Sequence, residues 1–373
     1  MLPRITPPFR AEHVGSLIRP DALIRAREAA ANGELALAEL ARIQHDAIRG
    51  VVALQEQIGF RVVTDGEYNR TYWQRDFLLK FANVSEAASR LSVRFRSAAG
   101  TRDRSPALVQ VTGRLARPRA IFVDDFRFLK SIAHGTPKIT IPSPTTMHFR
   151  GGRDAIDAAA YPNMDEFYAD LARVYREEIR DLAGAGCRYL QIDEVNLAYL
   201  CDPALRAQVR NIGEDPDTLP QTYARLLNET IRDRPPDMVV CMHLCRGNFA
   251  GAWVAEGGYD PIAELLFNDI AVDGYFLEYD SPRAGSFAPL RFLPKGKIAV
   301  LGLVTTKNPA LESKDEIKRR IDEASRHASL DQLALSPQCG FSSGIGGNAM
   351  AVDDEIAKLK LVVDTAREVW GSA

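Results

Sequence analysis

Short apolar runs alternate with longer segments of helical periodicity along most of the chain. In the clearest helical segment, residues 37–58, apolar side chains recur at three- and four-residue steps, and Gly59 ends the pattern. Similar helical patterns cover residues 21–32, 164–185, 219–234, 261–267, 313–328 and 350–369. Runs typical of buried strands lie near residues 13, 62, 139, 190, 240, 276, 300 and 334. Because these eight runs alternate with helical segments, we predict an α/β fold, a (β/α)8 TIM barrel, as one domain over residues 1–373.

The barrel pattern is interrupted between residues 91 and 122. Leu91–Arg96 and Leu108–Leu115 each alternate apolar and polar side chains, and the residues between them are rich in Gly, Arg, Asp, Ser and Pro. This arrangement predicts a β-hairpin inserted into the barrel over residues 91–122. Its arginines have two interpretations: contacts with an anionic substrate or, as we prefer, a solvated face or a contact between subunits.

The composition narrows the class of protein. Of the 373 residues, 46% are hydrophobic and 26% charged, which is ordinary for a soluble globular protein. The net charge of −2 gives no general attraction to nucleic acid or to an anionic membrane, and no apolar run reaches the roughly 20 residues that span a bilayer. The first residues lack the apolar core of a signal peptide, so a cytoplasmic protein is expected, and a homo-oligomer stays open. Five widely spaced cysteines argue against a disulfide framework.

Three of the predicted strands end in side chains that bind metals. One apolar run ends in His243-Leu244-Cys245, and residues i and i+2 of a strand point to the same side. Two later runs end in Glu278 and Cys339. If these strands are neighbours in a barrel, the four groups meet at its carboxyl end and form a site that suits zinc. The alternative is a buried core histidine, two buried thiols and a surface acid. Cys241 should lie deeper in the barrel.

The order of these residues resembles that of a known family. His-x-Cys, then Glu one strand later, then Cys-Gly near the C-terminus is similar to the catalytic domain of cobalamin-independent methionine synthase. The wider family includes single-barrel relatives and the epoxyalkane:coenzyme M transferases. The resemblance extends from the His13–Ser16 segment to Cys339. It implies a Zn²⁺ cofactor held by His243, Cys245, Glu278 and Cys339.

The resemblance also implies roles for residues outside the metal site. Asp193, in an Ile-Asp-Glu segment, would hold the ammonium group of an amino-acid substrate, and Glu67, in Asp65-Gly66-Glu67, would help to hold that substrate. Gly15 and Ser16 would meet the substrate carboxylate through backbone and hydroxyl groups. Each acid also has a plain interpretation, as a helix cap or as part of a salt-bridge cluster in a loop.

Three features depart from the family pattern and bear on the methyl donor. The sequence predicts a single barrel, and we expect the N-terminal barrel that helps methionine synthases to bind folate to be missing. Residues 195–199 read Val-Asn-Leu-Ala-Tyr, where the family has Pro-Ala-Leu-Arg-Glu. Residues 303–307 contain no His, where methionine synthases carry one that protonates the leaving folate. A corrinoid or corrinoid protein, an onium compound and an epoxide therefore stay open as donors.

The charge of the predicted site indicates its chemistry. Two thiolates and a carboxylate make the zinc a poor Lewis acid for water, but a metal-bound thiol loses its proton readily. The predicted function is therefore zinc-dependent alkylation of a thiol, namely methionine-synthase-like methyl transfer to homocysteine or a similar small thiol. Glu67, Asp193 and Glu278 are the expected catalytic residues. The alternatives are an epoxide-opening thioalkyltransferase and a non-catalytic barrel with structural zinc.

Overall fold

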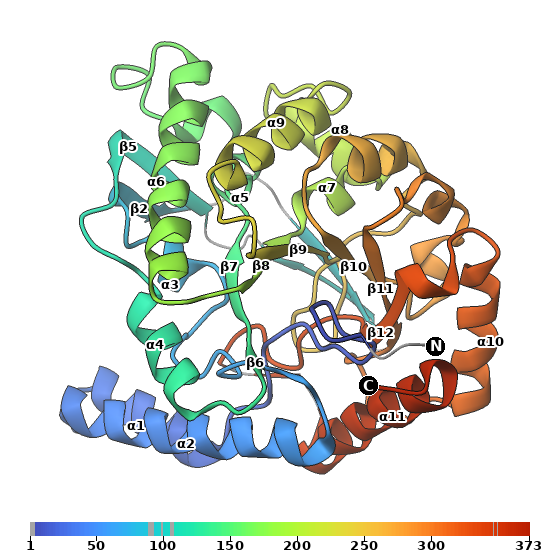
Figure 1. Ribbon diagram of the computed structural model, residues 1–373. Coiled ribbons are helices and arrows are strands. Elements are labelled where there is room, and N and C mark those ends of the chain that lie inside the picture. Colours follow the sequence, from blue (N-terminus) through green and yellow to red (C-terminus); the bar gives the residue numbers. More distant parts are fainter. Residues whose placement is uncertain (1–3, 89–92, 98–99, 105–107, 346, 349) are drawn as a thin grey trace.

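A computed structural model shows parallel strands at the centre of the molecule and helices around them (Figure 1). It describes residues 4–373 except 89–92, 98–99, 105–107, 346 and 349. Six parallel strands form one sheet in the order β12-β11-β10-β9-β8-β7. Their bounds are β7 Ile139–Pro142, β8 Tyr189–Glu194, β9 Val239–Leu244, β10 Gly274–Glu278, β11 Ile298–Val304 and β12 Leu333–Pro337. Every residue of these six strands is buried except the first residue of β9, as expected for strands covered on both faces.

Two shorter segments close the barrel between β7 and β12. Strand β1 (Val62–Val63) pairs in parallel with β6 (Thr136–Pro137), which leads directly into β7. The predicted first strand is reduced to a single parallel bridge between Ala11 and Leu335. The chain then curves away from β12, and Leu17 N donates to Gly66 O at 3.1 Å. The predicted (β/α)8 fold is thus confirmed. Its first strand is short because the segment from Ala11 to Leu17 bonds β12 at its start and the loop after β1 at its end.

The helices surround the sheet and follow the predicted periodicity closely (Figure 1). The predicted helix 261–267 is instead a 3-10 turn, Asp260–Ile262, followed by a π turn, Leu265–Asp269. The N- and C-terminal segments lie close together, since the Arg10 guanidinium stacks on the Trp370 ring at 5.5 Å. The helices are α1 Asp21–Ala31, α2 Leu37–Ile58, α3 Arg75–Leu78, α4 Val123–Ile132, α5 Thr146–Phe149, α6 Met164–Gly184, α7 Asn196–Tyr199, α8 Pro203–Asn211, α9 Leu219–Ile231, α10 Lys314–Ser325 and α11 Val352–Trp370.

The insertion after α3 contains two pairs of strands rather than one. Strand β2 (Ala82–Ala87) pairs antiparallel with β5 (Leu108–Ala116), and β3 (Val93–Ser97) pairs with β4 (Gly100–Arg104). The two alternating runs predicted to form one hairpin therefore pair with other strands instead. The sequence reading missed β2 and β4 because their sequences, ANVSEA and GTRDR, lack a strong apolar alternation. We call β2 to β5 the inserted arm.

A chain of buried polar side chains runs inside the barrel towards its carboxyl end. Lys138 Nζ lies 3.0 Å from Gln191 Oε1 and 3.4 Å from Glu12 Oε2. Gln191 Nε2 donates in turn to Asp193 Oδ1 at 2.7 Å. Gln191 and Asp193 are two residues apart on β8, so both point into the barrel. Because all these polar groups are paired, the barrel can bury them and fix the position of Asp193.

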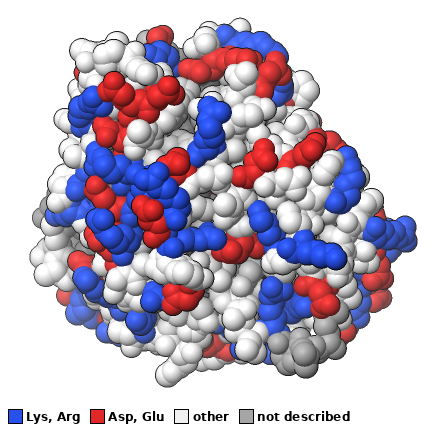
Figure 2. Space-filling model, turned by 45° about the horizontal axis from the view of Figure 1, so that its top comes forward, with Lys and Arg blue, Asp and Glu red and all other residues white. Residues whose placement is uncertain are grey.

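Basic and acidic side chains are interspersed over the surface that faces the viewer in Figure 2. The densest group of Lys and Arg side chains in this view contains acidic side chains among them. Pairs such as Arg114 with Asp170, 3.3 Å apart, join the inserted arm to α6. Among the described residues, no helix has the length and apolarity that crossing a membrane requires.

Candidate active site

His243, Cys245 and Cys339 come together at the carboxyl end of the barrel. His243 lies near the end of β9, Cys245 directly follows that strand, and Cys339 lies two residues after β12. One ligand atom from each lies within 4.8 Å of the others, and all three residues are buried. The two Sγ atoms are 3.3 Å apart, too far for a disulfide. The barrel therefore brings together three of the four predicted metal ligands.

The geometry of this group fits a tetrahedral zinc ion. Two thiolates bound at about 2.3 Å in tetrahedral geometry lie roughly 3.8 Å apart, so the sulfurs would move by only about half an ångström. Both ring nitrogens of His243 are buried without a hydrogen-bond partner among the described residues. An unpaired buried imidazole is costly unless something else binds it. The donor set of two sulfurs and one nitrogen suits zinc.

The three ligands also shift each other's pKa values. A hydrogen bond from Cys245 holds the pKa of Cys339 well below its usual value, with a further contribution from His243. The same bond and burial raise the pKa of Cys245. Burial alone would lower the pKa of His243, but the neighbouring Cys339 raises it. The group thus favours a thiolate at Cys339 before any metal is considered.

Glu278, the predicted fourth ligand, is not part of this group in the described structure. Its Oε2 accepts a hydrogen bond from Arg246 N at 2.8 Å, and its Oε1 lies 3.2 Å from Lys307 Nζ. Arg283 forms a further ion pair with it. Burial would raise the pKa of Glu278, but Lys307 and Arg283 lower it to about 2. The carboxylate is therefore ionised and held by cations, and its role as a zinc ligand stays a prediction.

Two buried acids, Asp193 and Glu67, line the cavity that His243, Cys245 and Cys339 also line. Asp193 lies beside His243 in the register of β8 and β9. Burial and the neighbouring Glu67 raise the pKa of Asp193 to about 7. Burial also raises the pKa of Glu67, against the effect of Arg70. Two close carboxyl groups favour a cationic ligand, since a positive charge stabilises both ionised forms.

The backbone around Glu67 is strained. Glu67 has a φ of 60°, in the left-handed region that a non-glycine residue rarely occupies. Its Oε1 accepts a hydrogen bond from Thr140 Oγ1 at 3.0 Å, whereas its Oε2 is buried without a partner among the described residues. A strained residue with an unsatisfied carboxylate oxygen at a cavity is typical of a binding position.

Gly15 and Ser16 lie in the segment that pairs with β12 at Ala11 and bonds the loop after β1 at Leu17. Ser16 lines the cavity, and Ser342 N lies 3.4 Å from its Oγ. Gly15 is outside the set of lining residues, and its φ is 146°. A Cβ on Gly15 would lie 2.8 Å from Thr140 Cγ2, so this glycine lets the backbone pass close to β7. Ser16 therefore lies at the cavity and Gly15 does not, and their contact with a substrate carboxylate stays a prediction.

The cavity above the metal-ligating group is small and partly aromatic. Its volume is about 60 Å³. Several of its walls were not predicted from the sequence, among them Tyr72, Trp73, Phe95, Arg150, Tyr199 and Phe249. Most of them follow strand ends, a position that the barrel rule could have flagged. Phe95, on the inserted arm, had no such signal.

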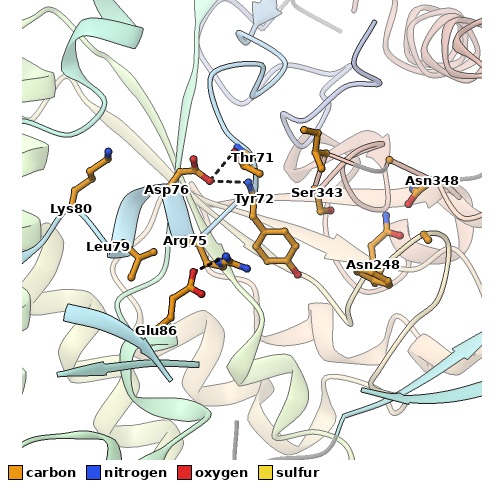
Figure 3. Close-up of a pocket in the computed structure, with 15 residues that line it drawn as sticks. Thr71, Tyr72, Arg75, Asp76, Leu79, Lys80, Glu86, Asn248, Ser343 and Asn348 are labelled. Atoms are coloured by element: carbon orange, nitrogen blue, oxygen red, sulfur yellow. Dashed lines mark hydrogen bonds and ion pairs between the residues drawn. The ribbon is translucent and has the colours of Figure 1, made fainter. Parts of the chain in front are cut away.

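A larger pocket of about 640 Å³ lies beside this cavity and shares Tyr72, Asn248, Phe249 and Ser343 with it. In Figure 3 the Tyr72 ring projects between the α3 side of this pocket and the Asn248 and Ser343 side. Asp76 accepts hydrogen bonds from Thr71 N and Tyr72 N, and Arg75 pairs with Glu86 at 2.6 Å. The volume suits a drug-sized ligand. We call it the outer pocket.

A (β/α)8 barrel with a buried His-Cys-Cys group at the carboxyl ends of its strands defines an enzyme-like class of protein. The family model "Cobalamin-independent synthase, Catalytic domain" matches residues 9–368, and the chain belongs to this family. The resemblance stated from the sequence is thereby confirmed. The family is one of methyltransferases.

Individual relatives agree with this assignment. The chain is 42% identical to the protein YxjH of Bacillus subtilis, over 97% of this chain and 95% of that protein. It is 26% identical to 5-methyltetrahydropteroyltriglutamate–homocysteine methyltransferase of Bacillus velezensis, over 85% of this chain but 37% of that protein. A crystal structure from Listeria monocytogenes, named as a candidate vitamin-B12-independent methionine synthase, has a TM-score of 0.78 at 34% identity and covers 99% of this chain and 100% of that one.

Proposed function

We propose that the chain is a zinc-dependent methyltransferase that methylates the thiol of homocysteine or of a similar small amino thiol. The observation that carries the proposal is the shared cavity: the buried His-Cys-Cys group and the paired acids Asp193 and Glu67 line the same space. One half of this cavity suits a thiol-binding metal, and the other half suits an ammonium group. Membership of a methyltransferase family supports the reaction type.

The residues of the cavity have distinct roles in this proposal. His243, Cys245 and Cys339 hold the zinc, which when bound lowers the pKa of a coordinated thiol and makes it nucleophilic. Asp193 and the unpaired Oε2 of Glu67 bind the substrate ammonium, which favours the ionised form of both acids. Ser16 and Arg150, which also line the cavity, contact the substrate carboxylate. The aromatic walls exclude water from the reacting sulfur.

The methyl donor is proposed to approach through the outer pocket, because that pocket shares Tyr72, Asn248, Phe249 and Ser343 with the cavity. In the reaction the thiol releases its proton to solvent, the sulfur lone pair forms the bond to the methyl carbon, and the electron pair of the methyl–donor bond leaves with the donor. Lys307, in the segment where the family carries its proton-donating His, pairs with Glu278 and lies 3.6 Å from Asp280. This pairing supports a donor that leaves without taking a proton, such as a corrinoid.

Metal retention tests the first half of the proposal. Cys245→Ala and Cys339→Ala should each lose most of the bound zinc, because each removes one of three clustered ligands. The zinc content of each variant is measured by elemental mass spectrometry. Cys241→Ala is the matched control, since Cys241 is buried on the same strand but outside the group. Zinc retained equally by all three variants would contradict the assignment.

Thiol binding tests the second half. Cobalt-substituted protein should show a saturable thiolate-to-cobalt charge-transfer band on titration with homocysteine, and a weaker response to 2-mercaptoethanesulfonate. The sulfonate thiol has no ammonium group for Asp193 and Glu67 and brings an anion to two acids. A full metal site with no response to either thiol would leave the metal in a structural role.

A further inference from the structure

The inserted arm reaches from the side of the barrel to its mouth. Its base, β2 and β5, is fixed to the barrel wall: Leu115 N donates to Tyr161 Oη at 2.7 Å, and Arg114 pairs with Asp170 on α6. Its tip, β3 and β4, belongs to residues 93–104, coloured cyan in Figure 1, and crosses the centre of the barrel in that view. The arm is thus a bridge from one wall of the barrel to its open end.

The tip docks on the loop that carries the metal ligand Cys245. Arg96 and Trp253 exchange two backbone hydrogen bonds of 2.8 Å each, as paired strands do. The Arg96 guanidinium lies 3.3 Å from Glu256 and 3.9 Å from the buried Asp202. Backbone pairing together with two ion pairs fixes the tip at a defined position over the site.

This docking places one side chain of the arm in the substrate cavity. Phe95 lines the same cavity as His243, Cys245 and Cys339. Its ring contacts that of Phe249, with centroids 5.4 Å apart, and Phe249 also lines the outer pocket. The neighbouring Arg94 is exposed, as expected for the opposite face of the strand. Phe95 therefore forms part of the cavity wall although it belongs to the inserted arm and not to the barrel.

Because the cavity is small, the position of the Phe95 ring affects which thiols can enter it. With Phe95 in place the cavity has a volume of about 60 Å³, against about 640 Å³ for the outer pocket beside it. A thiol that reaches His243, Cys245 and Cys339 therefore lies against the Phe95 ring. Because the Phe95 ring is backed by Phe249 and by a docked strand, it will yield to a slender thiol more readily than to a bulky one.

Resting on the proposed function, we propose that Phe95 is a specificity-determining residue. The inserted arm is the roof of the thiol cavity, and the Phe95 ring restricts access to His243, Cys245 and Cys339 to thiols with slender side chains.

The test compares two thiols without polar groups, ethanethiol and phenylmethanethiol, on full-length cobalt-substituted protein. The ratio of their dissociation constants, read from the charge-transfer band, measures discrimination against bulk. Removing the ring in Phe95→Ala should shift this ratio towards phenylmethanethiol by about tenfold or more, as for other apolar specificity pockets. Phe95→Leu should shift it less, and the control Arg94→Ala should leave it unchanged.

The outcomes separate this inference from the function on which it rests. An unchanged ratio in Phe95→Ala and Phe95→Leu, with thiol bands present, would overturn the role of Phe95 and leave the thiol site intact. A wild-type protein that binds neither these thiols nor homocysteine would overturn the proposed function itself. Circular dichroism confirms that each variant is folded, and Phe95→Leu carries the test if Phe95→Ala does not fold.

Discussion

Replacing Asp193 by Asn removes the negative charge that Asp193 carries when a cation lies in the cavity, and little else. Gln191 Nε2 donates to Asp193 Oδ1 at 2.7 Å, and the amide oxygen of Asn can accept the same bond. The variant therefore loses the proposed ionic contact with the substrate ammonium, worth about 1.5–3 kcal/mol, or roughly a 10- to 150-fold weaker affinity. Glu67 keeps part of the attraction, so the lower half of this range is expected.

The assay is the titration of cobalt-substituted protein with homocysteine and with 1-butanethiol, which lacks the ammonium and carboxylate. Asp193→Asn should weaken homocysteine binding and leave 1-butanethiol binding nearly unchanged. Glu194→Gln is the matched control, because Glu194 makes the same carboxyl-to-amide change one residue away but bonds Thr145 and the Asn196 backbone instead of lining the cavity. Equal weakening of both thiols in Asp193→Asn would refute the ammonium contact.

Two further predictions concern stability. Burial raises the pKa of Glu355 to about 8, above its value in the unfolded chain. The stabilisation of the folded state by the protonated carboxyl is therefore fully present below about pH 4.5. It is lost as pH rises through about 8, and the loss reaches up to about 5 kcal/mol. Glu355→Gln should therefore flatten the fall in unfolding free energy between pH 5 and pH 9 in urea titrations, and an unchanged slope would contradict this. In Gly302→Ala the new Cβ would lie 2.7 Å from Gln338 Cα and 2.8 Å from Leu277 O, so unfolding free energy should drop by about 1–3 kcal/mol. Gly184→Ala, in open space at the end of α6, should cost nothing, and equal effects would contradict the clash.

Most of the barrel followed from hydrophobic periodicity, because buried parallel strands and amphipathic helices have strong local signatures. Strands β7 to β12 lie where apolar runs predicted them. The segment near Ala11 did not form the expected strand, because its backbone bonds are divided between β12 and the loop after β1. That division depends on barrel closure, which is a property of the whole chain.

The candidate site could be predicted only as far as strand ends determine it. His243, Cys245 and Cys339 come together because β9 and β12 deliver them to one end of the barrel. The pairing of Glu278 with Lys307 and Arg283 was not predictable, since it joins loops through long side chains. The position of Phe95 depends on how β3 docks on Trp253, which the alternation of apolar and polar residues in β3 does not specify.

Binding of homocysteine sulfur to the metal can be measured by X-ray absorption at the zinc edge of the full-length protein, before and after addition of homocysteine. We expect two sulfur ligands at about 2.3 Å in the free protein, supplied by Cys245 and Cys339, and a third sulfur when homocysteine is bound. Asp193→Asn should require more homocysteine to reach the same spectrum. A first shell that keeps two sulfurs at saturating homocysteine would contradict thiol binding at this metal and leave the zinc with a structural role.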